Sequence, residues 1–155
     1  MLKSPKNKKV LRWSLITAGA ILLIGAAVYF YYATLEHEDT ASLKADYSVE
    51  ALPFIKEFEK DYKAANKKYA EKIIAVKGIV TETEQPVDTT MNIKMTDTIT
   101  GSYLIFAFQN KDMAKAKKLK QGNKVTIKGS FGDGIYSEIK EVYFINFQRS
   151  TVENK

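Results

Sequence analysis

The chain has 155 residues, with 24 Lys and Arg, 18 Asp and Glu, one His and no Cys. The absence of Cys excludes disulfides, thiolate metal sites and a cysteine nucleophile. The only His, His37, precedes the part that we expect to fold, so a Ser-His-Asp triad cannot be assembled in the folded domain.

The net charge of +6 is concentrated at the N-terminus, where the tail up to Arg12 holds five cations and no acid. The remaining 19 cations face 18 acids, which leaves +1. The rest of the chain therefore lacks the strong basic footprint that is typical of a nucleic-acid-binding protein.

Residues 13–35 form an uninterrupted run without a charged side chain. About 20 apolar helical residues cross the roughly 30 Å hydrocarbon core of a bilayer, so the run predicts a transmembrane helix. Trp13 at one end and Tyr29–Tyr32 at the other are typical of membrane interfaces. A cleaved signal peptide is the alternative, but its apolar region is shorter and ends in small residues.

Cations precede this run and acids follow it, so the positive-inside rule predicts a topology. Residues 1–12 form a basic cytoplasmic tail, and the chain after Leu35 lies outside the cytoplasm, on a cytoplasmic (inner) membrane crossed once. Residues 36–46 form a polar, acidic linker. His37 lies there beside Glu36 and Glu38 and could bind a cation weakly, but a solvated linker accounts for it, and we expect no metal and no cofactor.

A helix is predicted over residues 51–70, because apolar side chains recur there at intervals of three and four residues, at Ala51, Ile55, Phe58, Tyr62, Ala65 and Tyr69. The pattern then changes to that of strands over residues 72–84, 89–98 and 102–110. A short helix over 111–120 and two more strands follow. Gly132-Asp133-Gly134 predicts the tight turn between these last strands, and residues 151–155 are expected to be a loose C-terminus.

The order of one helix, three strands, one helix and two strands is that of a five-stranded OB-fold barrel, in an α+β domain over residues 47–150. The segments AANKKYAEKIIAVKGIV (64–80) and LKQGNKVTIKGSFGDG (119–134) resemble the tRNA-anti-like OB-fold family. The resemblance implies a barrel, often in bacterial envelope-associated proteins. It implies no reaction, because its motifs are structural and fold alone does not determine function.

OB-folds usually bind ligands on the face of their second and third strands and in the adjacent loops. There we expect ligand-binding residues at Asn92, Lys94, Thr96, Tyr103, Phe131 and Tyr136. Tyr103 and Phe131 could instead close the ends of the barrel. The lysines between 111 and 124 could form a basic face or a solvated helix flank, and Glu82 and Glu84 look exposed rather than catalytic.

The sequence favours a non-enzymatic binding module, held outside the cytoplasm by one membrane helix, with an envelope protein or a glycan as its partner. The alternative is a single-stranded nucleic-acid-binding barrel that uses Lys94, Tyr103 and the 111–124 segment.

Overall fold

The structure is a computed structural model that describes residues 6–34, 40–109 and 112–153. The chain divides into two compact units, Met1–His37 and Glu38–Lys155. The acidic linker segment with His37, and Lys111 of the lysine-rich segment, lie outside the described residues.

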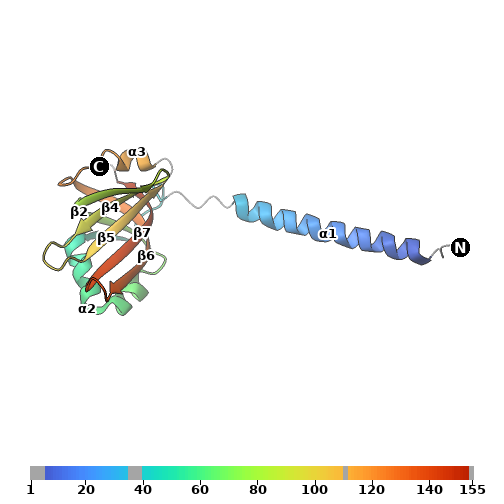
Figure 1. Ribbon diagram of the computed structural model, residues 1–155, viewed down its shortest axis with the longest axis horizontal. Coiled ribbons are helices and arrows are strands. Elements are labelled where there is room, and N and C mark those ends of the chain that lie inside the picture. The colour runs from blue at the N-terminus through green and yellow to red at the C-terminus, as the bar shows by residue number, and fades with distance from the viewer. Residues whose placement is uncertain (1–5, 35–39, 110–111, 154–155) are drawn as a thin grey trace. The chain divides into compact units, whose positions relative to one another are not determined.

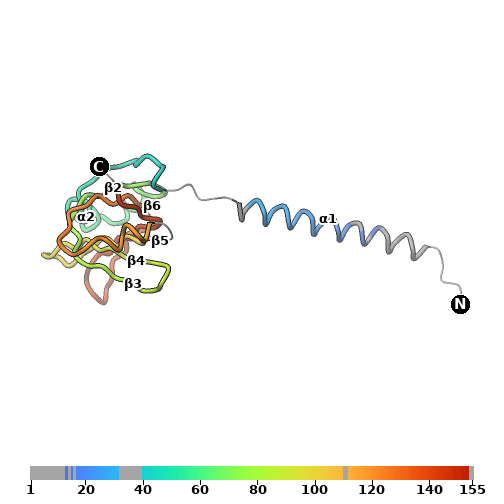
Figure 2. Tube along the Cα trace, turned by 90° about the horizontal axis from the view of Figure 1, so that it is seen from above, coloured from blue at the N-terminus to red at the C-terminus, as the bar shows by residue number. Residues whose placement is uncertain are grey.

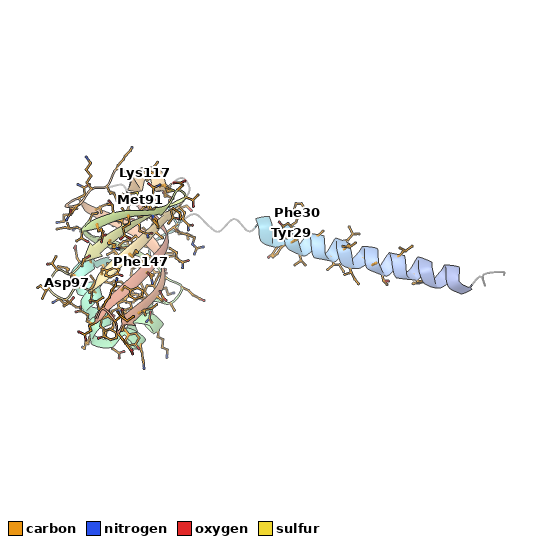
Figure 3. The ribbon with its side chains drawn as sticks, viewed as in Figure 1. Tyr29, Phe30, Met91, Asp97, Lys117 and Phe147 are labelled. Carbon is orange, nitrogen blue, oxygen red and sulfur yellow. The ribbon has the colours of Figure 1, made fainter. Side chains whose placement is uncertain are left out.

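The described part of the first unit is one helix, α1 (Lys6–Thr34), which covers most of the uncharged run. Several of its apolar side chains are exposed, among them Trp13, Leu22 and Leu23. Tyr29 and Phe30, labelled in Figure 3, pack edge to face with ring centroids 6.3 Å apart. Among the described residues, no helix combines the length and the apolar character that crossing a bilayer demands.

The second unit is an α+β domain built on one curved sheet (Figure 1). Within the described residues the sheet has seven strands, in the spatial order β1-β2-β6-β7-β5-β4-β3. The elements are, in chain order, β1 (Tyr47–Glu50), α2 (Ala51–Tyr69), β2 (Ile73–Ile79), β3 (Glu82–Val87), β4 (Thr90–Thr96), β5 (Tyr103–Gln109), α3 (Met113–Ala116), β6 (Lys124–Ser137) and β7 (Val142–Val152).

The sheet closes into an OB-type barrel, as the sequence predicts, because its first long strand is broken in two. β2 and β3 are separated only by Val80 and Thr81, yet β2 pairs with β6 and β3 pairs with β4. At the break the Thr81 N–H donates to Lys94 O (2.9 Å) and the Val80 N–H donates to Asn123 O (2.9 Å). β5 and β7 pair in parallel and complete the wall of the barrel. Figure 1 and Figure 2 show these strands curving round a common interior.

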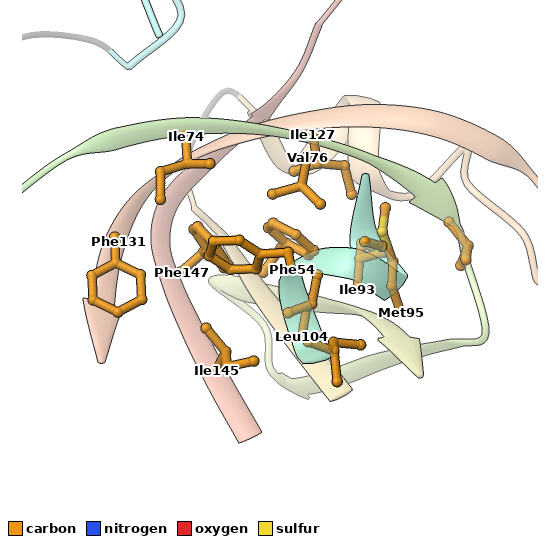
Figure 4. Close-up of a cluster of buried hydrophobic side chains, with 14 of the residues drawn as sticks. Phe54, Ile74, Val76, Ile93, Met95, Leu104, Ile127, Phe131, Ile145 and Phe147 are labelled. Carbon is orange, nitrogen blue, oxygen red and sulfur yellow. The ribbon is translucent and has the colours of Figure 1, made fainter. Parts of the chain in front are cut away.

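The interior of the barrel is filled from the strands and from α2 (Figure 4). Phe54 of α2 lies among Ile74, Ile93, Leu104 and Phe147, all of which are almost fully buried. On β4 the alternation is regular, with Met91, Ile93 and Met95 inward and Asn92, Lys94 and Thr96 outward. The buried core cluster among the described residues draws only on residues 51–147, so the second unit holds a complete core of its own.

The predicted helix over 51–70 is confirmed as α2, with a kink at Asp61 that sequence periodicity did not indicate. Asp61 has extended backbone angles (φ −158°, ψ 87°), and its Oδ1 accepts a hydrogen bond from the Ala64 N–H (3.0 Å), as an N-cap does. The kink lets Glu57 meet the end of the same helix, where Lys68 Nζ (2.7 Å) and Tyr69 Oη (2.8 Å) donate to its carboxylate.

The predicted tight turn at Gly132-Asp133-Gly134 is wrong. β6 runs through these residues to Ser137 with register shifts against β7, and the chain turns at 138–141 instead. The glycines are needed for a close approach, because a Cβ on Gly134 would overlap the ring of Phe58 from α2. Asn66 fixes this contact, since its side chain donates to Gly134 O and accepts from Gly134 N, both at 2.7 Å.

The expectation of a loose C-terminus over 151–155 is also wrong for its first residues. Thr151 and Val152 belong to β7 and pair with Lys128 and Ile127 of β6. Thr151 is buried and its hydroxyl donates to Asp112 Oδ1 at 2.7 Å. Its short polar side chain carried no sequence signal of this long-range contact.

Candidate functional site

The outward side chains of β4, β5 and β7 form one surface, called here the outer face. It contains Asn92, Lys94, Thr96, Tyr103 and Phe144, each partly exposed. They lie together because β5 pairs with β4 on one side and with β7 on the other. The outer face includes the second and third strands of the OB order, which is the usual ligand side of such barrels.

Two neighbouring aromatic rings on the outer face are called here the aromatic platform. Tyr103 of β5 and Phe144 of β7 are register partners, and their rings are nearly parallel (19°) with centroids 6.1 Å apart. Lys94 Nζ lies 5.6 Å from the centre of the Tyr103 ring. Exposed aromatic rings can stack on a planar ligand, and a cation beside them can contact the negative groups of that ligand.

The charge of Lys94 is already balanced by two acids of β3. Its Nζ lies 2.6 Å from Glu84 Oε1 and 3.2 Å from Glu82 Oε2. The hydrogen bond from Lys94 holds the pKa of Glu84 below its usual value, against the effect of partial burial. Burial lowers the pKa of Lys94, but the hydrogen bonds to Glu84 and Glu82 outweigh it and raise that pKa. Lys94 and Glu84 therefore stay ionised at neutral pH. An anion would have to compete with two carboxylates for Lys94.

The two polar side chains beside Lys94 differ in whether their hydrogen-bonding groups already have a partner. The Thr96 hydroxyl lies 2.9 Å from the Thr81 hydroxyl, across the break between β2 and β3, so it helps to close the barrel. The side-chain amide of Asn92 has no hydrogen-bond partner among the described residues, so it is available to form hydrogen bonds with a ligand. Of the residues predicted on this surface, Asn92, Lys94, Thr96 and Tyr103 are thus brought together.

The structure places the other two predicted residues elsewhere. Phe131 is only 6% exposed and packs against Phe58, Tyr69 and Phe147, so it belongs to the core. Tyr136 is exposed but lies on the other side of the β6–β7 hairpin, against Tyr143. Both were assigned from the expected turn at 132–134, and moving the turn to 138–141 changes their surroundings.

Sequence reasoning missed Phe144, which completes the aromatic platform. The signal was present in YFINF, where Ile145 and Phe147 alternate with Phe144 and Asn146. Once Ile145 and Phe147 are assigned to the interior, Phe144 must face outward.

The lysines of the 111–124 segment lie at the end of the barrel closed by α3. Met113 and Ala116 of α3 are buried and point into the barrel end, while Lys115 pairs with Asp112 (3.4 Å). Lys117, Lys118, Lys120 and Lys124, called here the lysine segment, are exposed, and no described carboxylate lies within ion-pair distance of them. Figure 3 shows Lys117 at this end of the domain.

In the described part of the chain, no three His, Asp or Glu side chains converge on one point.

The fold is similar to that of several solved structures. One is a Klebsiella pneumoniae protein described as a "putative nucleic acid-binding lipoprotein", with a TM-score of 0.55 and 18% identity over 76% of this chain and 98% of the other. Another is the asparaginyl-tRNA synthetase of Entamoeba histolytica, with a TM-score of 0.39 and 18% identity over 55% of this chain and 21% of the synthetase. Among curated proteins none matches this chain.

A family model connects the sequence with this barrel. The tRNA_anti-like family model matches residues 2–142, which is most of the chain, and its name agrees with the resemblance carried by segments 64–80 and 119–134. The chain therefore belongs to the tRNA_anti-like family.

Proposed function

We propose that the domain binds single-stranded nucleic acid on its outer face, without catalysing a reaction. The observation that carries the proposal is the aromatic platform of Tyr103 and Phe144, with Lys94 beside it on the usual ligand side of an OB barrel. The similar Klebsiella protein, named for nucleic-acid binding, supports the same assignment.

Stacking supplies most of the affinity in this proposal. Stacking of one base on an aromatic side chain is worth about 1–3 kcal/mol and tolerates any base. Lys94 adds little net positive charge because Glu82 and Glu84 accompany it. Each phosphate neutralised on a single strand contributes a slope of about −0.7 in log K against log salt. Binding through the outer face should therefore be weakly salt-dependent.

The test compares three aromatic substitutions in the full chain, kept in detergent, with a labelled 12-nucleotide strand and fluorescence anisotropy. Tyr103→Ala and Phe144→Ala should each weaken binding at least five-fold, from the loss of about 1 kcal/mol or more of stacking. Tyr136→Ala, an exposed aromatic off the outer face, is the matched control and should leave binding unchanged. Equal affinities for all four proteins would refute the assignment.

We further propose that residues 13–35 tether the domain to a membrane, with residues 1–12 in the cytoplasm and the domain outside it. The support is the uncharged run, the five preceding cations and the lipoprotein description of the Klebsiella protein. The full chain should resist extraction from membranes at alkaline pH, and external protease should reach the domain in spheroplasts. Complete protection of the domain beside digested exported controls would reverse the orientation.

A second candidate function, binding of an envelope protein or a glycan, is favoured by two exposed isoleucines. Ile99 in the β4–β5 loop is 88% exposed and Ile139 in the β6–β7 loop is 96% exposed. The two loops adjoin, since the Tyr143 N–H donates to Ser102 Oγ at 3.2 Å. Exposed apolar side chains that lie together mark a partner contact more often than isolated ones do.

A photo-crosslinking side chain at position 99 or 139 distinguishes this candidate. In intact cells it should trap one discrete protein, while the same group at position 136 should not. Crosslinks to nucleic acid from position 103 and none from 99 or 139 would favour the first function.

A further inference from the structure

The chain enters the domain at a fixed point. Thr40 is 3% exposed, and the buried Lys128 of β6 donates from Nζ to Ala41 O (3.1 Å) and to Leu43 O (2.7 Å). Asp46 then bonds twice to Ile73 of β2, through its backbone N–H (2.7 Å) and its carboxylate (2.8 Å). The segment is therefore attached to the barrel wall from residue 40 onward.

This entry point lies near the end of the barrel that α3 closes. Lys128, which holds residues 41 and 43, pairs with Thr151 of β7. The Thr151 hydroxyl donates to Asp112 at 2.7 Å, and Lys115 of α3 lies 3.5 Å from the same hydroxyl. A continuous series of contacts thus joins Ala41 to α3.

The same end is positively charged. Between Met113 and Gly132 the sequence has six lysines and no acid. Asp112, just before this stretch, is buried against Thr151 and Lys115. The exposed lysines of α2 differ, since Glu57, Glu59 and Asp61 are interspersed among them. The lysine segment is therefore a local excess of positive charge on an otherwise mixed surface.

We propose that the lysine segment docks the domain onto anionic lipid headgroups, a role that rests on the proposed tether. If the span ends at Leu35, the four residues between it and Thr40 allow a reach of at most about 18 Å from residue 35 to residue 40, so the entry point stays close to the bilayer. Each lysine near an anionic surface favours the bound state by roughly five-fold, and the tether supplies an effective concentration near the millimolar range.

Docking in this way leaves the outer face accessible. β5 runs from Tyr103 to Gln109 toward α3, a distance of about 20 Å at the usual rise of a strand. The aromatic platform and the loops with Ile99 and Ile139 would then lie at the end of the barrel away from the lipid.

The experiment uses residues 38–155, the compact unit that holds its own core, so its result does not depend on the tether. Flotation with vesicles of 30% phosphatidylglycerol in phosphatidylcholine should recover the domain, and vesicles of phosphatidylcholine alone should not. The variant with Lys117, Lys118, Lys120 and Lys124 all changed to Gln should lose at least ten-fold in binding. The control changes four exposed lysines of α2, Lys56, Lys60, Lys63 and Lys67, to Gln and should stay within about two-fold.

Two results would overturn the proposal: no binding to the anionic vesicles at low salt, or equal loss in the two quadruple variants. A third result would also overturn it. If the variant of the lysine segment kept vesicle binding but lost binding to a 12-nucleotide strand, the lysine segment would be assigned to nucleic-acid binding instead. Failure of the tether is seen separately, as extraction of the full chain at alkaline pH.

Discussion

The two ends of the barrel are closed in different ways. One is closed by α2, a helix of 19 residues that buries Phe54, Ile55, Phe58 and Tyr69. The other is closed by α3, a helix of four residues that buries Met113 and Ala116 and is followed by the exposed lysine segment. Figure 1 shows the two helices at opposite ends of the domain. We therefore expect stability to depend mainly on the α2 end, and the α3 end to tolerate exposed charge.

Truncating the apolar side chains at each end should show the largest difference. Phe58 is fully buried and touches Phe54, Tyr69 and Phe131, so Phe58→Ala should lower the free energy of unfolding by about 3–5 kcal/mol. Met113→Ala, with Met113 8% exposed, should lower it by about 2 kcal/mol. Urea unfolding followed by circular dichroism measures both, and equal losses would contradict the comparison.

The two ends of the barrel require glycine for different reasons: lack of space at Gly134 and a positive φ at Gly122. Substitutions at the two positions can distinguish these reasons. Gly134→Ala should lower the free energy of unfolding by about 2–3 kcal/mol, because the new Cβ would displace the Phe58 ring. Gly122 near α3 has φ +87° and open space around it, so Gly122→Ala should lower it by about 1 kcal/mol through backbone strain alone. Asn tolerates this conformation, so Gly122→Asn should recover part of the loss, whereas Gly134→Asn should be worse than Ala.

The ion pair within α2 should make stability depend on pH. Burial raises the pKa of Glu57, but hydrogen bonds from Lys68 and Tyr69 outweigh it, so this pKa lies below its ordinary value of 4.5. A lowered carboxyl pKa contributes stability that is present above about pH 4.5 and is lost as the pH falls through the lower, folded value.

Glu57→Gln should therefore reduce the free energy of unfolding at pH 7 by no more than about 1 kcal/mol, since the pair is partly exposed to solvent. The difference from the unaltered protein should shrink as the pH falls below about 4.5, in urea titrations at fixed salt. A difference that grows on acidification would mean that the pKa of Glu57 is raised instead.

Charge removal at the α3 end should have the smallest effect on folding. Lys117→Gln or Lys118→Gln should change the free energy of unfolding by less than about 0.5 kcal/mol, because exposed side chains without ion pairs contribute little. Thermal unfolding of each variant checks this. A loss above 1 kcal/mol would show that the lysine segment supports the barrel.

Periodicity predicted the barrel well where burial alternates on one strand or recurs along one helix. The inward and outward residues of β4 and the stripe of α2 follow directly from the sequence. Local patterns failed where a distant contact decides the structure. Gly132 and Gly134 resemble a turn, but the glycine at 134 accommodates Phe58, which lies 76 positions earlier in the chain.

The candidate site was predicted only in part, because local patterns again did not reveal the contacts between distant residues. Asn92, Lys94, Thr96 and Tyr103 lie on strands whose alternation is clear, and they do share the outer face. Phe144 could be assigned only after the hairpin was placed correctly, and the pairing of Lys94 with Glu82 and Glu84 depends on β3 lying beside β4. Neither relation is encoded in a local window of the sequence.

The parallel strand β1 has a consequence for self-association. It is a terminal strand of the sheet, only four residues long, and it ends at Glu50, which pairs with Lys77 at 3.2 Å. A short border strand with a charged pair is a poor template for another chain, and proteins often avoid aggregation in this way. Where many copies crowd together, this border should help them to stay separate rather than join into extended sheets.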